Sequence, residues 1–130
     1  MNRKLAAASF FLLAFSVCLG AFGAHALKDL GDVSAQQTFE TGVRYQFYGS
    51  FVLIIMAFRK EFNALNLRRW IRVFGIGLTL FCGSIYGLVL GNILDFSAKL
   101  FGPITPIGGT LMILSLIMIG IQLLRNPTQE

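Results

Sequence analysis

The sequence predicts an all-α integral membrane protein in which four transmembrane helices form an antiparallel bundle with both termini in the cytoplasm. Three observations carry this prediction. Of the 130 residues, 55% are hydrophobic and only 13% are charged, which is more apolar surface than a soluble core of this size can bury. Four apolar stretches follow one another along the chain, and the basic residues gather in alternate segments between them. We expect one membrane domain over residues 1–130.

The first span is expected at residues 5–27, and it ends in a stretch of small residues around His25, the only histidine of the chain. A bilayer core of about 30 Å needs roughly 20 apolar residues in a helix, so this stretch is long enough to cross. Ala24-His25-Ala26 resembles a signal-peptide cleavage site. A cleavable apolar core is typically about 7 to 15 residues long, however, so we expect the span to be retained.

The second span is expected at residues 36–58. Its purely apolar part is too short to cross a bilayer, so the helix must begin in the polar residues that precede it. Ser34 followed by Gln37 matches a capping box, which predicts a helix start near residue 35. Glu40 and Arg44 lie four apart with the acid first, the order that favours an ion pair on one face of a helix.

The third span, residues 70–94, contains the strongest packing signal in the chain. Gly83, Gly87 and Gly91 form a Gly-xxx-Gly-xxx-Gly ridge, and small residues at 79 and 75 extend the same row. Such ridges let helix backbones approach closely in lipid. We therefore expect the ridge to pack against another helix, either of the same bundle or of a second copy.

The fourth span is expected at residues 104–124. Thr105 can cap this helix, and Pro106 can occupy its first position without losing a needed N–H. Gly108 and Gly109 follow directly. They would admit another backbone close to the helix, and we favour that packing role over a ligand site.

The basic residues predict the orientation of the bundle. Those on the expected cytoplasmic side are Arg3, Lys4, Arg59, Lys60, Arg68, Arg69, Arg72 and Arg125, against Lys28, Arg44 and Lys99 on the other side. Cytoplasmic loops are enriched in Lys and Arg, so both termini are expected inside.

A polar cap is expected at the outer boundary, where four helix ends meet. Its members are His25, Glu40, Arg44, Tyr45, Gln46, Asp95 and Thr105. A histidine can exchange a proton near neutral pH, so His25 with Glu40 or Asp95 could handle a proton, an ion or a polar headgroup. The cap could instead tie helix ends together through hydrogen bonds, and we favour this structural interpretation.

Searches for reaction chemistry find no motif. The sequence has no nucleophile elbow, no Gly-rich phosphate loop and no His-Glu-x-x-His pattern. Cys18 and Cys82 lie within apolar runs and are expected to be small buried hydrophobes. We expect no catalytic residue, no metal and no cofactor. The net charge of +5 is not arranged as a basic stripe with interleaved aromatics, so no nucleic-acid partner is expected.

Four sequence blocks together resemble a known family. They are residues 19–27, 39–48, 81–88 and 104–109, and they look like the signatures of the family called domain of unknown function 423, which includes YgdD-like small inner-membrane proteins and is similar to transmembrane protein 256. The resemblance implies a bacterial inner (plasma) membrane protein with four helices and no established activity. Family members commonly carry a histidine where this chain has Gly49. A mechanism with two histidines facing each other across the first two helices is therefore not expected.

These observations leave three functional hypotheses. The leading one is a non-enzymatic binding or structural protein whose outward-facing cap binds a lipid headgroup or a membrane partner protein. The alternative is a small channel or transport subunit, a homo-oligomer assembled through the ridge of Gly83, Gly87 and Gly91. A third is an enzyme that acts on a lipid or quinone beside His25. In each case the lipid bilayer is the expected surrounding partner.

Overall fold

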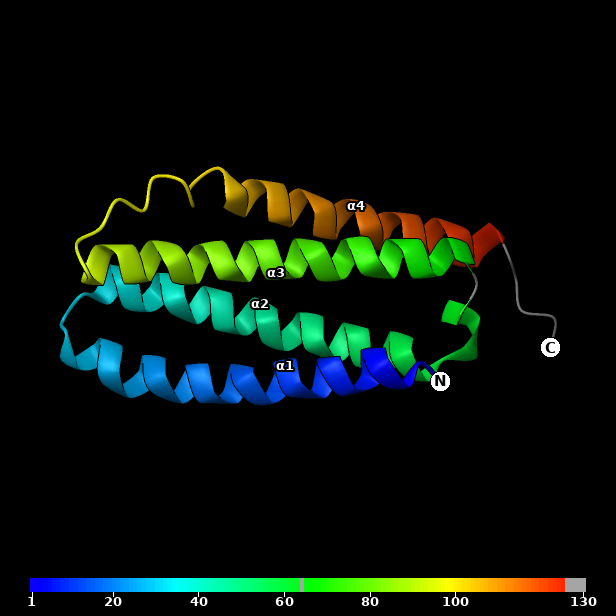
Figure 1. Cartoon of the computed structure of the whole chain (residues 1–130), viewed down its shortest axis with the longest axis horizontal. Coiled ribbons are helices and arrows are strands. Elements are labelled where there is room, and N and C mark those ends of the chain that lie inside the picture. Colours follow the sequence, from blue (N-terminus) through cyan, green and yellow to red (C-terminus); the bar gives the residue numbers. More distant parts are fainter. Residues whose placement is uncertain (64, 126–130) are drawn as a thin grey trace.

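The computed structural model describes residues 1–63 and 65–125. Over these residues the chain forms four α-helices, which lie side by side along one axis in Figure 1. They are α1 (Arg3–Phe22), α2 (Val33–Phe58), α3 (Leu65–Ile93) and α4 (Ile104–Arg125). A π-helical segment (Gly23–Leu27) continues α1, and a short 3₁₀ helix (Lys60–Asn63) follows α2. The predicted all-α antiparallel bundle is confirmed.

Within the described residues three helical segments are long and apolar enough to cross a membrane, namely Arg3–Leu27, Asn66–Ile93 and Ile104–Arg125, so the predicted span at residues 36–58 is not among them. α2 has 26 residues, about 39 Å at the rise of an α-helix, and runs alongside the other three in Figure 1. Its first half is more polar than the other spans because it carries acidic, basic and amide side chains. These groups lie on a helix that packs between α1 and α3.

The outside of the bundle is strongly apolar. Phe11 is 77% exposed and Leu124 is 85% exposed, and many other large apolar side chains of α1 and α4 are similarly uncovered. Such a surface would cause aggregation in water, but it is compatible with contact to the hydrocarbon chains of lipids. The exposed surface thus agrees with the apolar composition from which a membrane protein was predicted.

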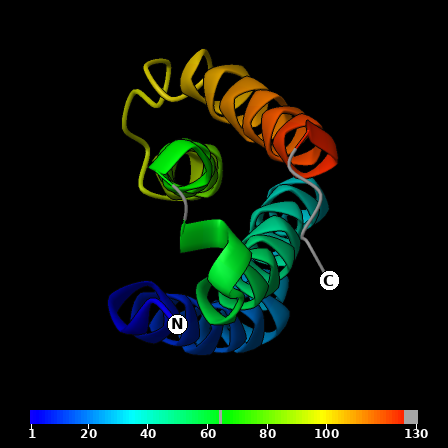
Figure 2. The same ribbon diagram turned by 90° about the vertical axis from the view of Figure 1, so that its right-hand side faces the viewer.

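Each helix packs against its neighbours in the chain. Backbone contacts join α1 to α2, α2 to α3 and α3 to α4. Within the described residues the backbones of α1 and α3 do not come into contact, and Figure 2 shows them flanking α2 without meeting. The bundle is therefore an open, curved row of helices.

The helix starts differ from the predicted caps. Asp32 caps α2, because its carboxylate accepts a hydrogen bond from the backbone N–H of Ala35 at 3.0 Å. The predicted cap Ser34 lies inside the first turn, so that prediction is wrong by two residues. Thr105 also lies inside its helix, and its hydroxyl is within 2.7 Å of the Ser84 hydroxyl of α3. It joins two helices where it was expected to cap one.

The prediction that the glycine ridge of α3 receives another helix is wrong. A Cβ added at Gly83 would meet open space, whereas one at Gly87 would lie 2.7 Å from the ring of Phe101. A Cβ at Gly91 would overlap Ala98. Phe101 and Ala98 belong to the connection between α3 and α4, which folds back over the end of α3. The ridge glycines therefore make room for the chain's own loop.

The close helix–helix approach lies on the opposite face of α3, at Gly77, which contacts Gly108 of α4. A Cβ at Gly77 would be 2.9 Å from the carbonyl oxygen of Gly108, and a Cβ at Gly108 would be 2.5 Å from the backbone N of Phe81. Only glycine permits backbones to pack at this distance. The expected packing role of Gly108 is confirmed.

Candidate functional site

The π-helical segment places His25 on the outside of the bundle. Gly23 and Leu27 both face α2: a Cβ at Gly23 would lie 2.8 Å from the ring of Phe39, and Leu27 is 1% exposed. The two residues are four apart, a spacing that puts them on one face of the helix. His25 lies between them in sequence and is exposed. Within the described part of the chain its side chain has no hydrogen-bond or ion-pair partner, so the expectation that His25 ties helix ends together through hydrogen bonds is wrong.

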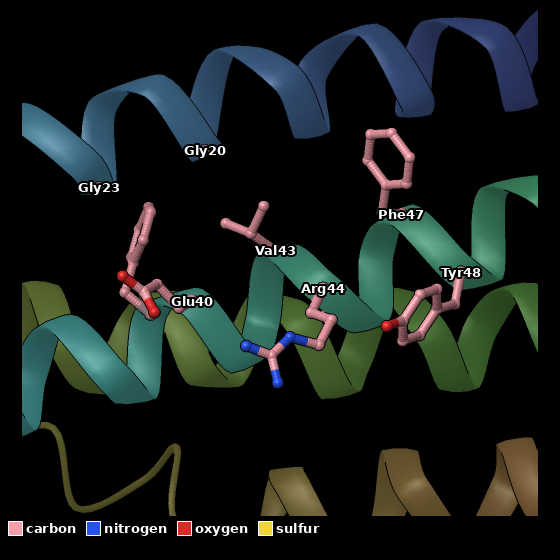
Figure 3. A pocket seen from close by; sticks show the side chains of 8 residues that line it. Gly20, Gly23, Glu40, Val43, Arg44, Phe47 and Tyr48 are labelled. Atoms are coloured by element: carbon pink, nitrogen blue, oxygen red, sulfur yellow. The ribbon is translucent and has the colours of Figure 1, made fainter.

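An open pocket lies beside this segment, between α1 and one face of α2. Its volume is about 370 Å³. Glu40, Arg44 and Tyr48 follow one another at intervals of four residues, so α2 presents them on one face. We call this cavity the Glu40–Arg44 pocket. In Figure 3 Val43 and Phe47 point from α2 toward α1, which carries Gly20 and Gly23, whereas the guanidinium of Arg44 and the phenol of Tyr48 lie along the outer side of α2.

Because Gly20 and Gly23 have no side chains, α1 leaves the pocket open on its side. A Cβ at Gly20 would lie 3.6 Å from the side chain of Val43, an ordinary contact, so a larger side chain there would extend over the pocket. Phe39, Val43 and Phe47 form its apolar lining. The pocket therefore combines an apolar base with a row of polar groups at its edge.

The predicted ion pair between Glu40 and Arg44 is not formed. Glu40 Oε1 instead accepts a hydrogen bond from Gln36 Nε2 at 3.2 Å. Arg44 is exposed and has no hydrogen-bond or ion-pair partner within the part of the chain that is described. Exposed pairs of this kind contribute only about 0 to 1 kcal/mol, so a competing amide is enough to separate them. Both charged groups thus remain available to a ligand.

Gln46 was predicted to belong to the polar cap, but its side chain lies in the interior of the bundle. It is 3% exposed, and its Nε2 donates to the backbone oxygen of Leu12 at 3.1 Å. Its Oε1 accepts from the hydroxyl of Tyr86 at 2.8 Å. Two residues beyond Arg44, an α-helix has turned by about 200°, which points Gln46 away from the pocket. It joins α1, α2 and α3.

The remaining cap residues also have separate places. The ring of Tyr45 packs against Phe81 of α3, with centroids 5.0 Å apart. Asp95 lies two residues beyond the end of α3 with a positive φ of 55°, a conformation that aspartate tolerates better than most residues. Thr105 is bonded to Ser84. The predicted cap is therefore not one cluster: only Glu40 and Arg44 of its members line the pocket.

Gly49 shows why a second histidine at this position would not face His25. Gly49 is buried, and a Cβ there would overlap the side chain of Leu78 on α3. Position 49 is ten residues beyond Phe39, which lies level with Gly23, and ten residues correspond to about 15 Å of helix. A side chain at 49 would point to α3, far from the π-helical segment.

Sequence reasoning missed Gly20, Gly23, Ser84 and Tyr86. The first two line the pocket and the last two are polar partners of cap residues. Ser84 and Tyr86 could have been found from the sequence, because a polar side chain in the middle of an apolar span needs a hydrogen-bond partner.

The described residues contain no group of three His, Cys, Asp or Glu side chains that could hold a metal ion. Cys82 is buried as predicted, but Cys18 is exposed.

These features define a small α-helical integral membrane protein with an open polar pocket at one end of its bundle. The chain matches the family described as "Protein of unknown function (DUF423)" over residues 19–109, and it belongs to that family. The matched range includes the π-helical segment, the whole of α2 and α3, and the start of α4.

Named relatives are membrane proteins too. The chain is 33% identical over 109 residues to a "UPF0382 membrane protein" of Haemophilus influenzae, which covers 79% of each chain. It is 36% identical over 108 residues to "UPF0382 membrane protein YwdK" of Bacillus subtilis, covering 80% of this chain and 82% of the relative. With "UPF0382 inner membrane protein YgdD" of Escherichia coli it shares 32% identity over 94 residues, covering 72% and 68%. No solved structure matches the chain.

Proposed function

We propose that this protein is a non-enzymatic membrane protein that binds a zwitterionic phospholipid headgroup in the Glu40–Arg44 pocket. One observation carries the proposal: an acid and a base line the same open pocket and are not paired with each other. A headgroup with a phosphate and an ammonium, as in phosphatidylethanolamine, has the complementary pair of charges.

The chemistry assigns a role to each part of the pocket. The planar guanidinium of Arg44 suits a phosphate, which it can contact through two hydrogen bonds. Glu40 keeps free acceptor positions beside its bond to Gln36, and these suit an ammonium. The apolar lining fits the glycerol and first methylenes, and the volume of about 370 Å³ lies within the usual range of about 300 to 1,000 Å³ for ligand pockets.

The orientation belongs to the same proposal. We place the end of the bundle with His25 and the pocket outside, and the end with both termini in the cytoplasm of a bacterial inner membrane. The distribution of Lys and Arg supports this placement. The pocket would then meet lipids of the outer leaflet.

Lipid retention by the purified protein tests the headgroup site. Native mass spectrometry with added phosphatidylethanolamine should show about tenfold weaker retention for Arg44→Gln and for Glu40→Gln, because each loses a charge-assisted contact. Lys28→Gln and Asp29→Asn remove the same charges at the same end but outside the pocket, so they are matched controls. Equal retention by the pocket variants and their controls would remove the proposal.

The alternative of a channel assembled through the glycine ridge receives less support. Gly87 and Gly91 are covered by the chain's own Phe101 and Ala98, so two of the three ridge positions are already occupied. Gly83 alone would offer a much shorter seam to a second copy.

A further inference from the structure

A second cavity lies at the other end of the bundle, in the gap between α1 and α3. Its main part has a volume of about 660 Å³ and is bordered by Leu5 and Leu12 of α1 and by Thr79 of α3, with Leu53 of α2 at its base. It shares Leu12 and Thr79 with a smaller cavity of about 170 Å³. We call the two together the α1–α3 groove. The Glu40–Arg44 pocket shares no lining residue with it.

The groove exists because α1 and α3 pack against α2 but not against each other. Small side chains widen it on both sides: Ala8 and Ser9 on α1 face Gly75 on α3 across the opening. A Cβ at Gly75 or at Gly83 would meet nothing within 4 Å. The groove thus opens to the surroundings of the bundle, which in a membrane are lipid chains.

The groove is long enough to hold an acyl chain of one leaflet. Its lining runs along α3 from Ile71 to Tyr86, which is about 22 Å of α-helix. Half of a hydrocarbon core of about 30 Å is shorter than this. The lining of the smaller cavity includes the hydrogen-bonded pair of Gln46 and Tyr86.

The mouth of the groove is basic. Arg72 borders both the groove and another cavity, of about 220 Å³, at the terminal end, which Arg68 and Asn2 also line. Arg68 and Arg72 are the charged residues among the described lining of these cavities, and both are exposed. Two like charges four residues apart on a helix repel each other, and an anion between them relieves the repulsion.

We infer that the α1–α3 groove binds one acyl chain of an anionic phospholipid, whose phosphate lies between Arg68 and Arg72. The apolar walls take the chain and the arginines take the headgroup, because guanidinium groups bind phosphate through paired hydrogen bonds. An uncharged apolar ligand would leave the two arginines unused. A zwitterionic lipid would bring an ammonium to a mouth that has two cations.

The first test compares vesicle lipids by headgroup charge. The purified full chain, examined by native mass spectrometry after transfer from vesicles of phosphatidylglycerol or of phosphatidylcholine, should retain phosphatidylglycerol in preference. Arg72→Gln should weaken that retention about fivefold, as expected for one basic residue near an anionic membrane surface. Arg69→Gln is the control, since it removes an exposed arginine of the same helix that lines none of these cavities. Equal losses in the two variants would overturn the proposal.

The second test fills the groove. Gly75→Leu should place a side chain in it without displacing a neighbour and should lower phosphatidylglycerol retention at least as much as Arg72→Gln. Gly120→Leu introduces the same side chain at an equally open position on α4, away from the groove, and should leave retention unchanged. If Gly75→Leu instead converts a dimer to a monomer without changing bound phosphatidylglycerol, the occupant is a second copy and the lipid proposal is wrong.

A third measurement locates the lipid. Phosphatidylglycerol with a photoactivatable group at the end of one acyl chain should label α1 and α3 along the groove, and labelling confined to α4 would contradict the proposal. Glu40→Gln and Arg44→Gln should leave this labelling of the groove unchanged, because neither residue lines it. The proposal for the groove and the proposal for the Glu40–Arg44 pocket can therefore be refuted separately.

Discussion

At the scale of single residues, polar side chains inside the bundle divide into two kinds. The hydroxyls of Ser9, Ser16 and Ser50 bond to carbonyl oxygens of their own helices at 2.7 to 2.9 Å. These hydrogen bonds satisfy the hydroxyls within their own helix and do not connect one helix to another. Gln46 instead bonds across to the carbonyl of Leu12 and to the hydroxyl of Tyr86. In lipid, where an unpaired polar group is costly, such a bond contributes to tertiary structure.

We predict that Gln46 and Tyr86 are energetically coupled. Gln46→Leu leaves the Tyr86 hydroxyl unpaired, and Tyr86→Phe leaves Gln46 Oε1 unpaired, so each single variant should lose about 1 to 3 kcal/mol of stability. The double variant removes both groups and should lose less than the sum. Reversible unfolding in mixed micelles measures the cycle, with an expected coupling of about 0.6 to 1.7 kcal/mol.

Ser50→Ala is the reference for this cycle, because it removes a buried hydroxyl that bonds only to the backbone of its own helix. Its combination with Tyr86→Phe should be additive. Additivity of Gln46→Leu with Tyr86→Phe would show that the hydrogen bond across the helices contributes nothing to the folded state.

At the scale of helices, the pairing of α3 and α4 depends on which glycines lie between two backbones. Gly77 and Gly108 are in contact across the interface, whereas Gly83 faces open space. A row of glycines in the sequence therefore identifies the helix that packs closely but not the face by which it packs. Gly77 is two residues from Gly75 and thus about 200° around the helix, so the opposite face of α3 makes the contact.

We predict opposite effects of alanine at these two kinds of glycine. Gly108→Ala forces a Cβ against the backbone of Phe81 and should destabilise the bundle by about 1 to 3 kcal/mol. Gly83→Ala adds a Cβ in open space and should stabilise α3 by about 0.5 to 1 kcal/mol, since glycine is a poor helix former. Thermal unfolding in detergent compares the two. A larger loss from Gly83→Ala would restore the sequence-based packing prediction.

Helices were predictable from sequence to within a few residues because apolar length and helix period are local properties. The start of α2 was missed because both Asp32 and Ser34 are good caps, and only the folded chain shows that Asp32 accepts the bond. The prediction of the polar cap was wrong because it depended on how the helices are rotated against one another. Residues near one membrane boundary share a depth, but depth does not determine the direction of a side chain, so Gln46 points inward while Arg44, two residues earlier, faces the pocket. Of the predicted site, Glu40 and Arg44 were found.

At the scale of the whole molecule, the open row of helices gives the two ends different surfaces. The end with the π-helical segment carries the Glu40–Arg44 pocket, which has one acid and one base. The end with the termini carries the mouth of the α1–α3 groove, which is lined by arginines. Each surface suits a different headgroup, and a fixed orientation would assign each to one leaflet.

That orientation gives the last prediction. A reporter enzyme active only in the periplasm should be inactive when fused after Glu130 and active when fused after Lys99, which lies in the connection between α3 and α4. The reason is that the basic residues between α2 and α3 and in the first turns of α3 are retained in the cytoplasm. Replacing Arg59, Lys60, Arg68, Arg69 and Arg72 by glutamine should raise the signal of the Glu130 fusion by weakening that retention. A strong signal from the unaltered chain at Glu130, with none at Lys99, would invert the bundle and place the arginine-lined groove in the outer leaflet.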